Sequence, residues 1–193
     1  MSTDQGSIFQ CTPFTVEKLR WWFNLLDVNK DGSISEADFQ LIASRYVQEY
    51  QLEEADTAEL GDKLVNSWGT QKLEAVEEEV KHNIPLISKM ADDLKAGLNI
   101  AQDDIIVAFE QLIEHNSQLA RSTLENMVAA FFDVFDYNQD NYITKQEFVV
   151  AMRCFGLEEP EVAETVFVCM GGDQEGRLSR QEYVDSWLNF LLG

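Results

Sequence analysis

The sequence predicts an all-α fold of four helix–loop–helix units in two pairs, packed into one compact globule with short antiparallel β-bridges between paired loops. Apolar residues recur at three- and four-residue intervals along most of the chain, which is the period of amphipathic helices. Two twelve-residue loops, 27–38 and 136–147, carry side-chain oxygens at positions one, three, five, nine and twelve. Two further segments, 93–104 and 171–182, keep the apolar eighth residue of such loops.

The first loop lies between two predicted helices. Thr12 and Pro13 suit a helix start, and apolar residues then repeat at helical spacing on both sides of the loop. They are Val16, Leu19, Trp22, Phe23 and Leu26 before it, and Phe39, Ile42, Ala43 and Tyr46 after it. A loop of this spacing between two amphipathic helices is the arrangement of an EF-hand.

Loop 27–38 offers the oxygen ligands that calcium prefers. The candidate ligands are Asp27, Asn29, Asp31, the Ser33 carbonyl, Ser35 and Asp38. Gly32 stands at the sixth position, where the loop turns sharply. Asp38 replaces the usual glutamate at the twelfth position, and its shorter side chain favours a single oxygen contact. Because magnesium prefers octahedral geometry, we expect it to compete with calcium, especially at this loop.

Segment 93–104 is the predicted partner of the first loop, because a single EF-hand cannot bury its apolar face alone. Lys95 and Gly97 fall at ligand positions, and a lysine there opposes a cation. We therefore expect this hand to keep its helices without a metal. Residues 47–92 before it read as mostly helical, with Leu64, Val65 and Trp68 on one face and Glu77–Glu79 on a solvated face.

Loop 136–147 has the more complete ligand set. The candidates are Asp136, Asn138, Asp140, the Tyr142 carbonyl, Thr144 and Glu147. Asn141 replaces glycine at the sixth position, and asparagine is one of the few other residues that tolerate a left-handed backbone. The flanking helices are marked by apolar residues from Leu124 to Phe135 and from Phe148 to Phe155.

Segment 171–182 is the predicted partner of loop 136–147. Gly171 at its first position has no side-chain oxygen, although Glu182 closes the segment as a ligand would. One helix face before it carries Val162, Val166, Phe167 and Met170, and one after it carries Tyr183, Trp187, Phe190 and Leu191. We expect a structural hand, and two EF-hand units that span 1–118 and 119–193.

Composition narrows the functions. The chain has 35 acidic against 14 basic residues, a formal charge of −21, which excludes a nucleic-acid surface and disfavours stable membrane association. No apolar run approaches a membrane span. His82 and His115 stand alone, and no catalytic grouping is evident, so we expect no enzyme. Three unpaired cysteines, Cys11, Cys154 and Cys169, indicate a reducing compartment, and we expect a cytoplasmic monomer.

The two oxygen-rich loops and the last helix carry a family resemblance. Residues 22–39 resemble the first hand of invertebrate sarcoplasmic calcium-binding proteins, residues 135–148 resemble the third, and residues 187–193 resemble the end of the last. Calexcitin, the coelenterazine-binding (luciferin-binding) proteins and the photoproteins are similar members of the wider group. The resemblance implies four EF-hands, one or two of them inactive, and a cytosolic calcium and magnesium buffer.

Two alternatives to a buffer stay open at this point. One is a calexcitin-type calcium sensor that acts on a protein target, and the other is a calcium-triggered protein that binds coelenterazine. The low methionine count of 5 favours a fixed core over the flexible Met-rich groove of a sensor. The 12 Phe, 5 Tyr and 4 Trp could line a cavity for an apolar ligand or fill the core, and we predict that the tryptophans are core residues.

Overall fold

The computed structural model describes residues 11–52, 60–62, 64–65, 78–172 and 176–193. Its helices are α1 (Pro13–Leu26), α2 (Glu36–Tyr50), α5 (Glu78–Asn83), α6 (Pro85–Lys95), α7 (Gln102–His115), α8 (Ser117–Phe135), α9 (Lys145–Cys154), α10 (Pro160–Cys169) and α11 (Arg180–Leu192). Its strands are β1 (Ser33–Ile34), β2 (Ile100–Ala101), β3 (Tyr142–Thr144) and β4 (Arg177–Ser179). The predicted fold class, helical with short β-bridges, is confirmed.

Each bridge joins two loops at their eighth residues. Strand β1 pairs antiparallel with β2, which places Ile34 opposite Ile100. Strand β3 pairs antiparallel with β4, which places Ile143 opposite Leu178. All four of these side chains are buried. The predicted bridges are therefore confirmed, and so is the numbering that makes 93–104 and 171–182 the partners of the two oxygen-rich loops.

The ninth residue of a loop also starts the helix that follows it. Thr144 caps α9, where its hydroxyl accepts the backbone N–H of Glu147, and the Glu147 carboxylate returns a bond to the Thr144 N–H. Ser179 and Glu182 form the same capping box at α11. This S/T-x-x-E pattern satisfies backbone donors that a helix start leaves without partners. Loop closure and helix initiation therefore use the same side chains.

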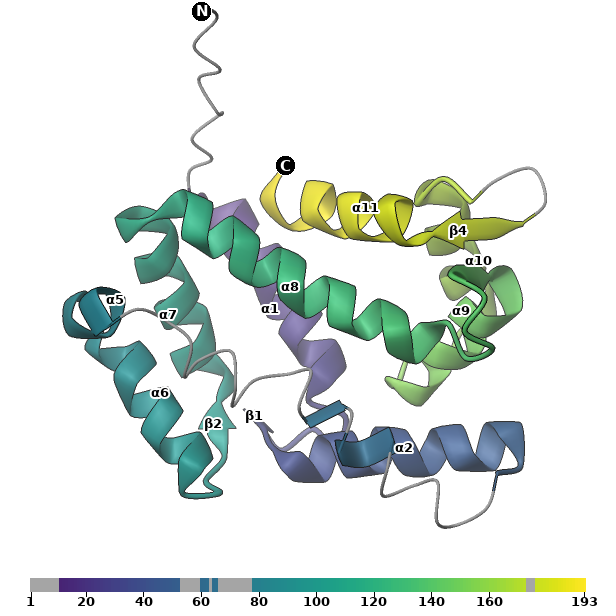
Figure 1. The fold of residues 1–193 in the computed structure, drawn as a ribbon, viewed down its shortest axis with the longest axis horizontal. Coiled ribbons are helices and arrows are strands. Elements are labelled where there is room, and N and C mark those ends of the chain that lie inside the picture. Colours follow the sequence, from purple (N-terminus) through teal and green to yellow (C-terminus); the bar gives the residue numbers. More distant parts are fainter. Residues whose placement is uncertain (1–10, 53–59, 63, 66–77, 173–175) are drawn as a thin grey trace, which may run out of the picture.

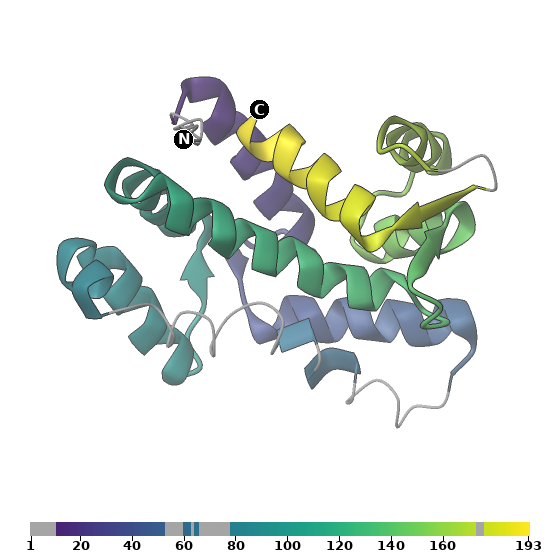
Figure 2. The ribbon, with the colours of Figure 1, turned by 45° about the horizontal axis from the view of Figure 1, so that its top comes forward.

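Helix α8 crosses the middle of the molecule, with α7 packed on one side of it and α11 on another (Figures 1 and 2). Its buried aromatic residues connect both halves, since Phe131 meets Trp22 of α1 edge-on and Phe132 meets Tyr183 of α11. The start of α1 lies near the end of α11, where Lys18 Nζ donates to the Gly193 carbonyl over 2.8 Å. The buried residues form one continuous core.

The tryptophan prediction is right in two cases and wrong in one. Trp22 and Trp187 are buried, but Trp21 is 40% exposed. Val162 and Phe190, which were predicted on apolar helix faces, are also 47% and 42% exposed. The helical period identifies a face but not whether a neighbouring element covers it. Trp68, the acidic residue Glu77 and residues 173–175 lie outside the described part of the chain.

Helix α2 joins the first EF-hand pair to the second. Its Tyr50 ring stacks on Tyr137, the second residue of loop 136–147, with centroids 3.8 Å apart and planes within 9°. Nearby, Arg45 donates to the Cys154 carbonyl over 3.0 Å, and Glu49 forms an ion pair with Arg153. The exit helix of one oxygen-rich loop thus ends against the other loop.

We expect this stacking to stabilise the fold measurably. A double-mutant cycle with Tyr50→Ala and Tyr137→Ala should give a coupling energy of about 1 kcal/mol in urea unfolding at saturating calcium, because stacked rings gain that much beyond area burial. Tyr142→Ala is the control, since Tyr142 is equally exposed in the same loop but stacks on Arg177 instead. Additive effects of Tyr50→Ala and Tyr137→Ala would contradict the prediction.

Candidate metal centre

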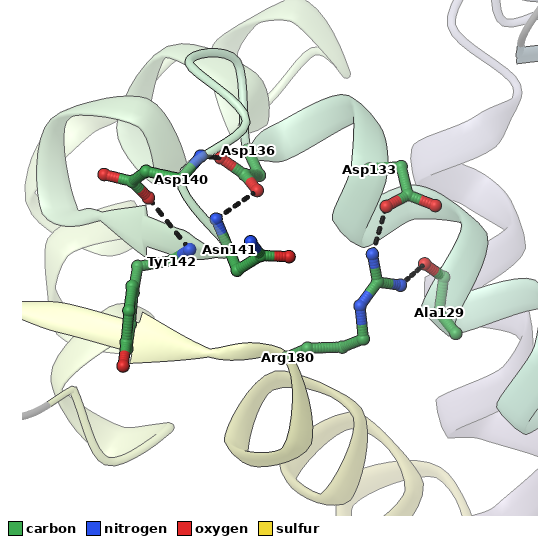
Figure 3. Close-up of polar contacts among 7 residues, drawn as sticks. All are labelled: Ala129, Asp133, Asp136, Asp140, Asn141, Tyr142 and Arg180. Carbon is green, nitrogen blue, oxygen red and sulfur yellow. Dashed lines mark hydrogen bonds and ion pairs between the residues drawn. The ribbon is translucent and has the colours of Figure 1, made fainter.

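The first residue of each oxygen-rich loop ends the helix before it and turns its carboxylate into the loop. The Asp27 carboxylate accepts the backbone N–H groups of Asp31 and Gly32 at 3.1 and 3.0 Å. In the other loop, the Asp136 carboxylate accepts those of Asp140 and Asn141 at 3.1 and 2.9 Å (Figure 3). Each loop therefore curves around the carboxylate of its first residue, because the backbone N–H groups of its fifth and sixth residues bond to that carboxylate.

The third and fifth residues repeat one arrangement in both loops. Asn29 accepts the N–H of Asp31 at 2.8 Å, and its amide donates to the Asp31 carboxylate at 3.1 Å. Asn138 makes the same two bonds to Asp140, at 3.0 and 3.1 Å. The fifth carboxylate then accepts the N–H of the seventh residue at 2.9 Å in each loop. The two loops thus share their internal bonding, although their sequences differ at eight of their twelve positions.

The sixth position requires a left-handed backbone. Gly32 takes a φ of +83° there, and Asn141 takes +68°. The fourth residues, Lys30 and Gln139, are also left-handed, at +61° and +59°. Each such residue other than glycine costs about 1 kcal/mol or more. The prediction that Asn141 tolerates the glycine conformation is confirmed.

The twelfth carboxylate closes each loop onto its exit helix. One Asp38 oxygen accepts the Asn29 N–H at 3.2 Å, and the other accepts the N–H and hydroxyl of Ser35 at 2.9 and 3.0 Å. Glu147 makes the equivalent bonds to Asn138 and Thr144, at 3.3, 2.9 and 2.7 Å. The Asp38 carboxylate reaches these partners although its side chain is one methylene shorter than that of Glu147.

The residues of both loops fit a divalent cation. Asp27, Asp38, Asp136 and Glu147 are all at most 8% exposed. Within the described residues, no Lys, Arg or His forms an ion pair with any of them. A buried carboxylate needs a compensating charge. Both oxygens of Asp27 and Asp136, and one oxygen each of Asp38 and Glu147, accept a single backbone N–H and so keep a second lone pair. A cation between the first and twelfth residues would supply that charge.

The side chains do not yet form a closed cage. Within the described ranges, no three Asp, Glu, His or Cys side chains gather closely enough to hold a metal ion as they stand. The carboxylates instead bond to loop amides and hydroxyls. These bonds already hold each loop in shape.

Burial raises the pKa of Asp136 above its usual value, and the negative charges of Asp140 and Glu147 raise it further. The amide donors from Asn141 and Asp140 oppose this rise without cancelling it. Since the pKa is higher in the folded state, the stability that this group contributes is lost as the pH rises from the unfolded to the folded pKa. Ionised Asp136 therefore destabilises the metal-free protein, and a cation would relieve that cost.

We expect the Asp136 carboxyl to titrate above pH 3.8 in the metal-free protein, followed by its side-chain carbon chemical shift in NMR. Asp140→Asn should lower this pKa, because it removes a neighbouring negative charge and keeps the backbone N–H donor. Glu125→Gln, an exposed change outside the loop, is the control. Titration of Asp136 at or below its usual value would contradict the burial argument.

Segment 93–104 has lost the loop and kept the bridge. Helix α6 continues through Lys95, so the first three loop positions are helical. It ends with Gly97 at a φ of +68° and the Leu98 N–H bonded to the Asp93 carbonyl at 2.8 Å, a Schellman ending. The sequence pattern indicated Lys95 as the obstacle to metal binding. In the structure the helix ending is the larger obstacle, because it replaces the start of the loop.

Sequence reasoning missed a second feature of this hand. The Lys89 ammonium lies 3.1 Å from the Asp93 carboxylate and 3.3 Å from that of Asp104. These are the first and twelfth positions of the segment, so a side-chain cation stands beside the two carboxylates that would bracket a metal. The i, i+4 spacing of Lys89 and Asp93 was the available signal.

The described residues of segment 171–182 keep two features of the other loops. Gly176 has a φ of +76° at the sixth position, and the Glu182 carboxylate accepts the Ser179 N–H at 2.8 Å, as in the other loops. Glu182 is exposed, however, whereas Asp38 and Glu147 are buried. Arg180, the first residue of α11, bonds the Ala129 carbonyl at 3.1 Å and pairs with Asp133, which fastens this hand to α8 (Figure 3).

Comparison with known families agrees with this geometry. Residues 125–188 match the family described as an EF-hand domain pair, and residues 19–43 match the family described as EF hand. These ranges cover the hands of loops 136–147, 171–182 and 27–38. The fold and the loops therefore define an EF-hand calcium-binding protein.

Individual proteins that are similar to this chain give a more specific comparison. Sarcoplasmic calcium-binding proteins of Perinereis vancaurica tetradentata and Mizuhopecten yessoensis are each 25% identical to this chain, covering 77% and 93% of it and 72% and 90% of their own lengths. The calcium-loaded apo coelenterazine-binding protein of Renilla muelleri has the same fold, with a TM-score of 0.69 at 20% identity over 95% of this chain and 92% of its own.

The chain is thus similar to sarcoplasmic calcium-binding proteins, and it is also 23% identical to the luciferin-binding protein of Renilla reniformis over 93% of its length. These calcium-binding and luciferin-binding relatives belong to non-enzymatic families. Within the part of the chain that the structure describes, no helix is both long and apolar enough to cross a membrane.

Proposed function

We propose that this EF-hand protein is a cytoplasmic, monomeric calcium and magnesium buffer with two functional sites. The ligands are Asp27, Asn29, Asp31, Ser33, Ser35 and Asp38 in one site, and Asp136, Asn138, Asp140, Tyr142, Thr144 and Glu147 in the other. The observation that carries the proposal is the shared bonding of the two loops around buried carboxylates without a cationic partner. The two-unit division at residue 118 remains part of this proposal.

The chain's own groups divide the work of binding. The first and twelfth carboxylates supply charge from the two ends of each loop, and the third and fifth side chains supply oxygens from its exposed edge. Ser33 and Tyr142 present backbone carbonyls from β1 and β3, whose bridges fix their direction. A bound ion neutralises the buried carboxylates, and the loop amides keep those carboxylates oriented toward it.

The packing of the core favours a buffer over the alternatives. Its aromatic residues contact one another closely, as where Phe135 meets Phe148, Phe155 and Tyr183 at centroid distances of 5.5–5.7 Å. Such rings fill the interior, as a fixed core does. The contacts of α2 with α9 also resist separation of the halves. Buffer EF-hands open little when they bind calcium, in contrast to sensors.

Calorimetric titration with calcium in millimolar magnesium should count two sites. Glu147→Gln and Asp38→Asn should each remove one of them, because each loses a charged ligand while its amide oxygen can still accept helix-start bonds. Glu182→Gln is the matched control at the twelfth position of segment 171–182 and should leave the count at two. A count that falls with Glu182→Gln would refute the assignment of sites.

Asp38→Glu should raise calcium affinity at loop 27–38 and weaken competition by magnesium, by about tenfold each. The longer side chain can offer both oxygens, which suits the larger coordination number of calcium. The measurement is calcium titration of this variant at several magnesium concentrations, with Glu147→Gln present so that loop 136–147 is silent. If magnesium competes equally before and after the change, the twelfth residue does not set the preference.

A further inference from the structure

A pocket of about 590 Å³ opens between α1, α10 and α11. Its apolar lining comes from Trp21, Val166, Cys169, Met170, Trp187 and Phe190. We call it the α1/α10/α11 groove. It lies away from the metal loops' oxygen ligands, and none of its lining residues belongs to either ligand set.

The groove is open because the two helices of the last hand pack on different neighbours. Helix α11 packs on α8 and α1, while α10 packs on α9. At its base the Ser186 hydroxyl donates to the Met170 carbonyl at 2.9 Å, which holds α11 to the end of α10. The helices therefore form two walls of fixed spacing.

The aromatic wall of the groove has an uncovered face. Trp21 stacks on Trp187 with centroids 6.2 Å apart, and Phe190 meets both rings edge-on at 5.6 and 6.0 Å. Trp21 and Phe190 remain 40% and 42% exposed despite these contacts. Val162, at 47%, continues the apolar stripe one turn along α10. Contiguous exposed apolar surface of this kind marks interaction sites.

Negative charge borders the groove on all three helices. Glu17, Glu161 and Asp185 are exposed, and each stands one helical turn before a residue that lines the groove. The Lys18 ammonium lies 5.9 Å from the ring centroid of the lining residue Phe190, but Lys18 is buried, and its ammonium is bonded to the Gly193 carbonyl and lies 4.8 Å from the Phe14 ring centroid. The border would therefore attract a positively charged partner.

We propose that the α1/α10/α11 groove docks an amphipathic helix of a partner protein, with apolar residues on one face and Lys or Arg beside it. Helical walls with an apolar floor suit helix-in-groove recognition, and the acidic border supplies charge complementarity. The ten-residue α10 sets a wall about 15 Å long, enough for three turns of a partner helix. This inference goes beyond buffering and does not depend on how many metal sites bind.

The test uses a synthetic helix of about 14 residues, four turns long, with Leu on one face and Lys on the other. Calorimetry at saturating calcium should show saturable one-to-one binding. Trp21→Ala and Phe190→Ala should each weaken it by about tenfold, as for central aromatic contacts. Val107→Ala on α7, with a matched exposure of 40%, should leave affinity unchanged. Circular dichroism checks that each variant folds, and Val162→Ser offers a milder change.

Two further experiments test where the peptide binds and whether the acidic border of the groove contributes to its affinity. In a Cys11→Ser background, bound peptide should slow the reaction of the exposed Cys169 thiol with a disulfide reagent, while Cys154 is buried. Glu161→Gln with Asp185→Asn should weaken binding and reduce its salt dependence, and Glu114→Gln on α7 should not.

Three results would overturn the proposal. Equally tight binding of a peptide with Glu in place of Lys would remove the charge argument. The groove variants could bind with full affinity, which would place the peptide elsewhere. Sedimentation could show a dimer that Phe190→Ala dissolves, which would make a second copy of this chain the occupant.

Discussion

The structure depends on how buried carboxylates at the two ends of a loop are held. The first and twelfth residues of each oxygen-rich loop lie inside the protein, and their oxygens accept backbone N–H groups of the loop, including that of the residue that caps the next helix. These bonds shape the loop, start the exit helix and aim the β-bridge residue into the core. They leave the negative charge itself without a counterion, so the same groups that build the hand also create its demand for a cation.

The loops could be predicted from sequence because their chemistry is local. Spacing within twelve residues fixes the bonds of Asp136 and Asn138, and a buried Ile or Leu at position eight fixes the pairing. The exposure of Trp21 and the contact of Lys89 with Asp104 could not be predicted, because both depend on where distant elements pack. A helical period shows that a face is apolar, but it does not name the element that covers it.

The two EF-hand pairs are connected by side chains that serve the loops as well. Helix α2 begins at the closing carboxylate of loop 27–38 and ends with Tyr50 stacked on Tyr137 in loop 136–147. Arg180 similarly fastens the start of α11 to the end of α8, just before Asp136. Movement at one loop is therefore resisted by elements that belong to the other hands, which suits a protein that takes up ions without rearranging.

The ammonium of Lys89 places a side-chain positive charge beside Asp93 and Asp104, the first and twelfth residues of segment 93–104. In a pair of two working hands, filling one loop prepares the other through the shared bridge, and uptake becomes steep. In this protein the positive charge beside one hand of the pair is the Lys89 ammonium, and this charge does not depend on the concentration of free ions. The partner of loop 27–38 is not a second binding loop, so calcium binding at loop 27–38 would not be cooperative within the pair. Its binding curve would be shallow, and ions would bind gradually across a wide range of concentrations.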